Sequence, residues 1–102
     1  MSHQQALHAL SDPTRREIFE KLRRSSASVS ELAEGMPVTR PAVSQHLKVL
    51  KSAGLVRESR RGVHRVYQVD LKGLVALRRY IDTLWTDVLE GFQQEADRSK
   101  EP

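Results

Sequence analysis

The segment 39–69 restricts the fold of this chain more than any other stretch, because a helical pattern is followed at once by a hairpin pattern. Within residues 40–52, apolar side chains recur at helical spacing, at Val43, Leu47 and Leu50. The opposite side of such a helix carries small, polar or basic side chains, namely Pro41, Ser44, Gln45, Lys48 and Ser52. We therefore expect a helix that packs on a core through one face and leaves a polar, positively charged face in solvent.

Two strand-like runs follow this helix and indicate a hairpin. Gly54 is placed to end the helix, and residues 55–59 and 63–69 form the two runs. The turn between them is expected at 60–62, with the sequence RRG. The second run contains three valines and one tyrosine, which supports it better than the first.

Helix start signals divide the remaining chain. Helices are expected at 4–10, at 13–24 after the cap Asp12, at 31–35 after the cap Ser30, and from 71 onward after the cap Asp70, while Thr39 caps the helix 40–52. A chain of 102 residues has room for one domain, which we place at 1–95, followed by a polar tail at 96–102. Fraying is expected from Gln93 onward. The predicted fold is mainly α with a small β-hairpin wing, a winged helix-turn-helix in the order α-α-α-α-β-β-α.

Positive charge is concentrated in one segment. Residues 40–65 hold seven basic side chains and one acid, whereas residues 1–39 are neutral and residues 66–102 are acidic on balance. A basic patch of this kind fits nucleic acid. A membrane-binding helix would instead place bulky apolar residues opposite its charges, and here most of the charge lies on a predicted turn and hairpin.

The polar face of the helix 40–52 has the chemistry for reading double-stranded DNA. Gln45 can pair with adenine through two hydrogen bonds, and Ser44 can donate to or accept from several bases. Basic side chains nearby suit phosphates, which supply affinity rather than sequence choice. The predicted DNA-binding residues are Thr39, Arg40, Ser44, Gln45, His46, Lys48, Lys51, Arg60, Arg61, His64 and Arg65. A merely solvated face is the alternative interpretation of such charges, but a helix-turn-helix, an apolar-free outer face and an arginine-rich turn on an otherwise neutral or acidic chain together favour DNA binding. For His46 the sequence favours a half-buried hydrogen-bonding residue over a base contact, and a phosphate stays within its reach.

The last helix carries an apolar stripe that one small domain cannot cover. Its leucines, valines and aromatic residues repeat at spacings of three and four residues. A homodimer would cover them, and the predicted interface residues are Leu7, Leu10, Leu77, Ile81, Leu84, Trp85 and Val88. The aromatic residues Tyr80, Trp85 and Phe92 could line an effector pocket, although side chains at this spacing usually pack in a core.

At family level, the motifs SDPTRREIFEKL and RPAVSQHLKVLKSAGLV, followed by the RRG wing, resemble those of the ArsR family of bacterial winged helix-turn-helix repressors. The similarity covers about residues 4–92. It implies a homodimer that binds a near-palindromic operator and blocks transcription, commonly of its own operon. By position it assigns base contacts to Ser44 and Gln45, and wing contacts to Arg60, Arg61 and Arg65.

The sequence departs from the metal-sensing members of that family. The chain has no cysteine, and the positions that match the family's cysteine pair hold Ser28 and Ser30, whose hydroxyls bind soft ions poorly. The last helix has aspartates, but no histidine follows His64. His3 and His8 are spaced to lie on different sides of a helix. We therefore expect no metal and no cofactor, as in the metal-independent branch of the family, and an unidentified small-molecule effector stays open.

Other functions have weaker support. The chain has no phosphate-binding loop, nucleophile elbow or metal-ligand cluster, so an enzyme is not expected. No apolar run is long enough to span a bilayer and the N-terminus does not resemble a secretion signal, which favours the bacterial cytoplasm, at the nucleoid, and no membrane partner. The alternative function is a winged-helix module that binds protein or RNA, which would expose apolar or aromatic residues on the helix 40–52.

Overall fold

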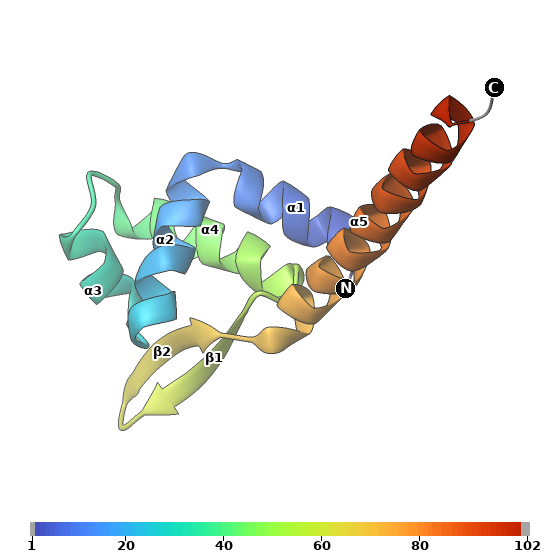
Figure 1. Cartoon of the computed structure of the whole chain (residues 1–102). Helices are drawn as coiled ribbons and strands as arrows, with labels where there is room; N and C mark the ends of the chain where they lie inside the picture. Colours follow the sequence, from blue (N-terminus) through green and yellow to red (C-terminus); the bar gives the residue numbers. More distant parts are fainter. Residues whose placement is uncertain (1, 101–102) are drawn as a thin grey trace.

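Five helices and one two-stranded hairpin make up the part of the chain that the structure describes, residues 2–100 of a computed structural model (Figure 1). In chain order they are α1 His3–Ser11, α2 Pro13–Arg24, α3 Val29–Glu34, α4 Arg40–Ser52, β1 Val56–Arg61, β2 His64–Val69 and α5 Leu71–Ser99. This confirms the predicted order α-α-α-α-β-β-α and the mainly helical class. The predicted tail 96–102 ends in residues 101 and 102, which lie outside the described residues.

The body around the hydrophobic core consists of α1, α2 and α4, with α3 at one end (Figure 1). The largest fully buried side chains are Ile18, Val43, Leu47, Leu50, Leu55 and Val56. Three of them come from α4, whose predicted inner face is thereby confirmed. Burial of one such side chain stabilises the fold by about 1.5–3 kcal/mol, so this face fixes the orientation of α4.

The turn between α1 and α2 is held by side chains at both helix ends. Asp12 accepts a hydrogen bond from the backbone N–H of Arg15 at 2.9 Å, as its predicted role of N-cap requires. Arg15 and Arg16, in the first turn of α2, donate back to the carbonyls of Ala9 and Leu10 at 2.8 and 3.1 Å. Both arginines therefore satisfy carbonyls of the last turn of α1.

Helix α3 begins two residues earlier than predicted. Its N-cap is Ser28, not Ser30, and a complete capping box joins Ser28 to Glu31. The Ser28 hydroxyl accepts from the N–H of Glu31 at 3.2 Å, and the Glu31 carboxylate accepts from the N–H of Ser28 at 3.0 Å. The pattern Ser-x-x-Glu at 28–31 marks this start in the sequence, whereas Ser30 lies in the first turn.

The wing differs from the prediction at its tip. The turn is Gly62 and Val63, and Arg60 and Arg61 belong to β1, where they pair with Arg65 and His64. Gly62 has φ of 66°, and the residue after it has no positive φ, as in a type II′ turn. A valine that is 89% exposed therefore stands at the tip.

A short bridge, which no sequence pattern predicts, joins the wing to the body. Ala27, in the connection between α2 and α3, exchanges two backbone hydrogen bonds with Tyr67 of β2, at 3.1 and 2.8 Å. This bridge pairs the free edge of β2 with the connection before α3, and so fixes the position of β2 relative to α3.

Helix α5 starts at the predicted cap Asp70 but runs to Ser99, beyond the predicted fraying point at Gln93. Gln93 donates a hydrogen bond to Asp97 at 3.2 Å, one helical turn away, and Arg98 pairs with Glu95 at 3.8 Å. From residue 78 to residue 100 every residue is exposed, and the helix projects from the body (Figure 1), which gives the described chain a length of 71 Å.

Candidate nucleic-acid interface

The outer face of α4 has the composition that the sequence predicted. Ser44, Gln45 and Lys48 are exposed, on the side of the helix that faces away from its buried residues. Thr39 caps the helix, because its hydroxyl accepts from the N–H of Ala42 at 3.2 Å. The helix therefore offers hydrogen-bonding and basic groups on a rigid element whose other side is fixed in the core.

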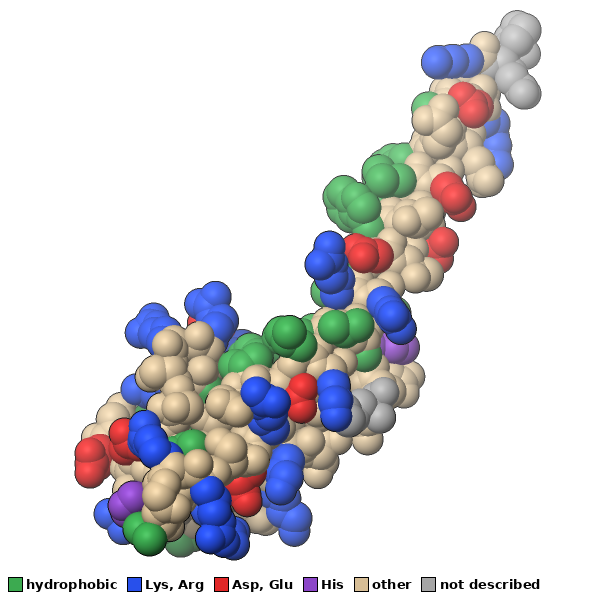
Figure 2. All heavy atoms as spheres, turned by 90° about the horizontal axis from the view of Figure 1, so that it is seen from below, with side chains coloured by type: hydrophobic (Ala, Val, Ile, Leu, Met, Phe, Trp, Pro, Cys, Tyr) green, Lys and Arg blue, Asp and Glu red, His purple; other side chains and the backbone are tan. Residues whose placement is uncertain are grey.

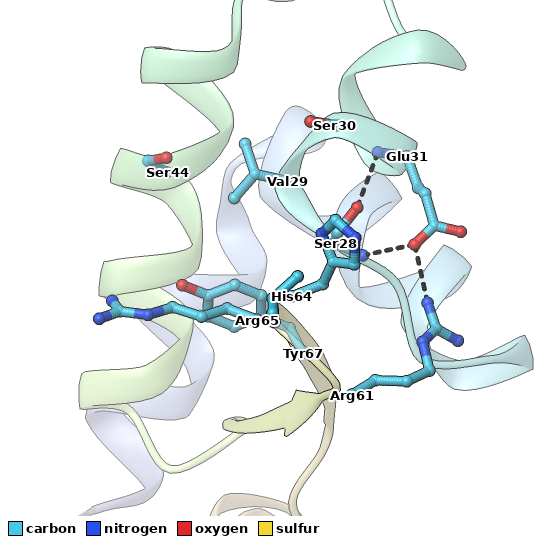
Figure 3. Close-up of a pocket in the computed structure, with 10 residues that line it drawn as sticks. Ser28, Val29, Ser30, Glu31, Ser44, Arg61, His64, Arg65 and Tyr67 are labelled. Atoms are coloured by element: carbon cyan, nitrogen blue, oxygen red, sulfur yellow. Dashed lines mark hydrogen bonds and ion pairs between the residues drawn. The ribbon is translucent and has the colours of Figure 1, made fainter.

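The outer face of α4 and the wing border the same hollow, which has a volume of about 650 Å³ (Figure 3). The start of α3 forms its third side. The lining residues are Ser28, Val29, Ser30, Glu31, Ser44, Arg61, Val63, His64, Arg65 and Tyr67. Of these, Ser44, Arg61, His64 and Arg65 were predicted to bind DNA. The hollow thus brings Ser44 of α4 close to wing residues that are about twenty positions away in the sequence, whereas Gln45 and Lys48 are not among its lining residues.

The two wing arginines that line the hollow point in different directions (Figure 3). Arg65 extends toward α4, whereas Arg61 extends toward α3 and forms an ion pair with Glu31 at 3.1 Å. The hydrogen bond from the Ser28 backbone N–H is the main cause that lowers the pKa of Glu31, and Arg61 lowers this pKa further. The carboxylate is therefore ionised at neutral pH, and Arg61 meets a full negative charge.

Glu58, in the middle of β1, forms ion pairs with two further basic residues of this region. Its carboxylate lies 4.0 Å from the Lys51 ammonium of α4 and 3.8 Å from the Arg65 guanidinium of β2. The Tyr67 hydroxyl donates to it at 3.3 Å. Burial, and to a smaller extent the charge of Glu58, raise the pKa of Tyr67, so the phenol keeps its proton and remains a donor. Glu58 therefore links the wing to α4.

Ten of the eleven predicted DNA-binding residues are exposed, and His46 is half-buried. His46 lies near enough to Asp12 for its charge to contribute to the lowered pKa of that carboxyl, whose main cause is the hydrogen bond from Arg15.

Arg57 was not predicted as a site residue. With the Gln68 amide turned to accept, Arg57 donates to it at 2.8 and 3.1 Å, across the hairpin.

The sequence analysis missed Glu31, Glu58 and Tyr67 as members of this surface. The capping motif identifies Glu31 only as a helix-start residue, and its partner Arg61 is 30 residues away. Glu58 appears in the sequence only as the one acid among basic residues. Their contacts depend on how the hairpin folds against α3 and α4, for which the sequence has no local signal.

The predicted dimer residues fall into two groups. Leu10 and Leu77 are partly buried against the core of their own chain. Leu7, Ile81, Leu84, Trp85 and Val88 are exposed, with Trp85 at 64%. Figure 2 shows a hydrophobic cluster on the projecting helix, while Lys and Arg side chains gather around the compact end of the molecule. The two surfaces are therefore separate.

The histidines near the N-terminus do not form a ligand cluster. The His3 ring stacks on Tyr80 of α5, with ring centroids 4.1 Å apart, and joins α1 to α5. Within residues 2–100, no group of three or more metal-binding side chains comes together. In the same residues, no helix is long and apolar enough to cross a membrane.

Comparisons with known proteins agree on one group of relatives. A family model described as a helix-turn-helix domain matches residues 10–59. The HTH-type transcriptional regulator Rv2034 of Mycobacterium tuberculosis is 52% identical over 96 residues, which are 94% of this chain and 90% of that protein. The transcriptional repressor SdpR of Bacillus subtilis is 34% identical over 62 residues, which are 61% of this chain and 69% of that protein.

The fold also matches solved structures along nearly its whole length. An ArsR-like transcriptional regulator from Rhodococcus sp. RHA1 superposes with a TM-score of 0.76 at 34% identity, over 92% of each chain. Because this match leaves out only 8% of the chain and α5 has 29 residues, most of the projecting helix is part of the shared architecture.

Proposed function

This chain belongs to the ArsR family of winged helix-turn-helix transcriptional regulators, and we propose that it binds a near-palindromic operator as a homodimer and so represses transcription, that of its own gene included. The relatives are named as transcriptional regulators, and SdpR is named as a transcriptional repressor, which supports DNA binding and repression. A DNA-bound repressor works on the chromosome, so the proposal places the protein at the nucleoid, in the bacterial cytoplasm.

One observation carries the proposal: Ser44, on the polar outer face of α4, and basic residues of the wing border a single hollow. The major groove of DNA is about 12 Å wide and admits one α-helix. With α4 in the groove, a hairpin beside it lies over the neighbouring backbone. Phosphates there attract the basic groups of the wing.

The proposed roles follow from side-chain chemistry and position. Ser44 and Gln45, exposed on the middle of α4, would meet base edges. The other proposed contacts are to phosphates, by Thr39, Arg40, His46, Lys48, Lys51, Arg60, Arg61, His64 and Arg65. Counterion release from those phosphates supplies most of the affinity for any DNA sequence, and the base contacts discriminate between sequences.

The homodimer is proposed from the apolar surface of α1 and α5. Leu84, Trp85 and Val88 are 47%, 64% and 41% exposed in the single chain, on a helix that projects from the body. Large exposed apolar patches mark interaction sites, and a two-fold dimer covers the same patch on both subunits. Leu7, Leu10, Leu77 and Ile81 would extend this interface. Two α4 helices would then meet major grooves about one helical turn apart.

A binding experiment tests the proposal directly. Fluorescence anisotropy at physiological salt would compare a labelled duplex from upstream of this protein's own gene with a scrambled duplex of the same length and composition. We expect the upstream duplex to bind at least about 10³-fold more tightly. Equal affinities would contradict operator binding at the protein's own promoter. Sedimentation of the complex would give the number of protein chains per duplex, and one chain would contradict the dimer.

A further inference from the structure

Arg61, a wing residue assigned to a phosphate, is already bound to an anion of its own chain. Its guanidinium donates to Oε1 of Glu31 at 3.1 Å. The side chains of Arg61 and Glu31 are 60% and 54% exposed, so the pair lies at the surface on which DNA would rest. In Figure 3 the pair bridges the wing and the start of α3, beside the hollow that α4 also borders.

The carboxylate of this pair is held by a second hydrogen bond within α3, whereas the guanidinium is at the end of a long side chain of the wing. Oε1 of Glu31 also accepts the backbone N–H of Ser28 at 3.0 Å, as part of the capping box of α3. Arginine reaches Glu31 through a long side chain with several rotatable bonds, and it can turn to another acceptor nearby. A DNA phosphate group is such an acceptor, since two of its oxygens can accept from arginine together, as the two oxygens of a carboxylate can.

We propose that Glu31 is an intramolecular competitor for DNA phosphate, which holds Arg61 and thereby weakens binding to every DNA sequence. This inference rests on the proposed function, because it assumes that the wing meets DNA. When DNA binds, a backbone phosphate replaces the carboxylate on Arg61, and Glu31 is left facing the polyanion. This cost is the same for operator and random DNA, so Glu31 lowers both affinities by the same factor and leaves their ratio unchanged. Glu31 thus shortens the time that the protein spends on any DNA, non-operator DNA included.

The variant Glu31→Gln separates the charge of this residue from its structural role. Glutamine completes a capping box as glutamate does, because its amide oxygen accepts the same backbone N–H. The chain itself provides the precedent, since Ser2 and Gln5 form a capping box at the start of α1. We therefore expect α3 to persist in Glu31→Gln, with a melting temperature lowered only slightly by the loss of one exposed ion pair.

The experiment measures binding to the scrambled duplex and to the upstream duplex over a range of salt concentrations. Glu31→Gln should tighten binding to both about two- to fivefold at low salt, the range expected when one exposed ion pair is removed. The dependence of log K on log salt should become steeper, by up to about 0.9, because one more phosphate charge is neutralised without a compensating carboxylate. Glu34→Gln is the matched control. Glu34 is also exposed on α3 and has no ion pair among the described residues.

A double-mutant cycle with Arg61→Ala decides whether the effect passes through the pair. In the Arg61→Ala background, Glu31→Gln should tighten binding by no more than Glu34→Gln does, because only the general repulsion between a carboxylate and DNA is left to remove. The proposal is overturned if Glu31→Gln does not tighten binding, if Glu34→Gln tightens it equally, or if the gain from Glu31→Gln is as large without Arg61 as with it. It is also overturned if only Glu31→Ala, which removes the capping bond as well, alters binding. All of these comparisons can be made on scrambled DNA, so they stand even if the upstream duplex is not an operator.

Discussion

At the residue scale, Gln45 and Lys48 provide neighbouring side chains with different expected effects on binding. Both are exposed on the outer face of α4. A glutamine amide can pair with one base, whereas a lysine ammonium attracts phosphates of any sequence. We expect Gln45→Ala to weaken binding to the operator by about 1–3 kcal/mol and to relax the preference at one base pair. Competition binding with operator variants changed at single positions would measure this.

Lys48→Ala is the matched control for Gln45→Ala, on the same face of the same helix. It should weaken operator and scrambled DNA by similar factors and reduce the salt slope by about 0.9. If Gln45→Ala gave this same pattern, Gln45 would be a phosphate contact and the base reading would lie elsewhere on α4.

At the element scale, the order of helices and strands can be predicted from the sequence, because the residues that start and end each element lie within or beside it. Thr39, Asp12 and Asp70 cap helices that start where the sequence predicted, because a cap acts over only two or three residues. The contacts of the wing could not be predicted in this way. The bridge between Ala27 and Tyr67 and the pair between Glu31 and Arg61 join residues that come together only after the hairpin packs on the body.

The junction of α4 and α5 depends on a glycine that the sequence analysis did not single out. The N–H of Gly73 donates to the carbonyl of Gly54 at 2.8 Å. A Cβ on Gly73 would lie 2.6 Å from the carbonyl oxygen of Ala53 and 2.9 Å from that of Gly54, which are backbone atoms. We expect Gly73→Ala to destabilise the fold by about 1–3 kcal/mol, because α5 must shift to make room. Urea unfolding at a fixed protein concentration would measure the change.

Gly91→Ala is the control for this junction, since Gly91 lies on the same helix and a Cβ there would meet nothing within 4 Å. Alanine favours a helix over glycine by up to about 1 kcal/mol, so this variant should be as stable as the parent or more so. Equal stabilities of the two variants would mean that the α4–α5 junction tolerates a methyl group, and that close approach there does not set the direction of α5.

At the scale of the whole molecule, the body folds around its own core, whereas the outer part of α5, residues 81–99, is exposed throughout in the single chain. Leu84 lies on the apolar stripe of that part and is 47% exposed, so an aspartate there costs the monomer little. In a dimer the same aspartate would be a buried, unpaired charge, which is strongly unfavourable. We expect Leu84→Asp to give a folded monomer by sedimentation equilibrium and to lose most of the affinity for an operator with two half-sites.

Thr83→Asp adds the same charge to the adjacent residue, on the opposite side of α5 from the apolar stripe, and it should remain dimeric. The comparison removes net charge and helix propensity as explanations, because both variants place an aspartate on the same exposed turn. A single half-site duplex extends the test to DNA. On this half-site duplex the affinities of Leu84→Asp and the parent should differ less than they do on the full operator. One α4 helix is enough to occupy one groove, so the dimer adds little there. If Leu84→Asp stayed dimeric at the concentration at which Thr83→Asp does, the subunits would associate through a surface other than this face of α5.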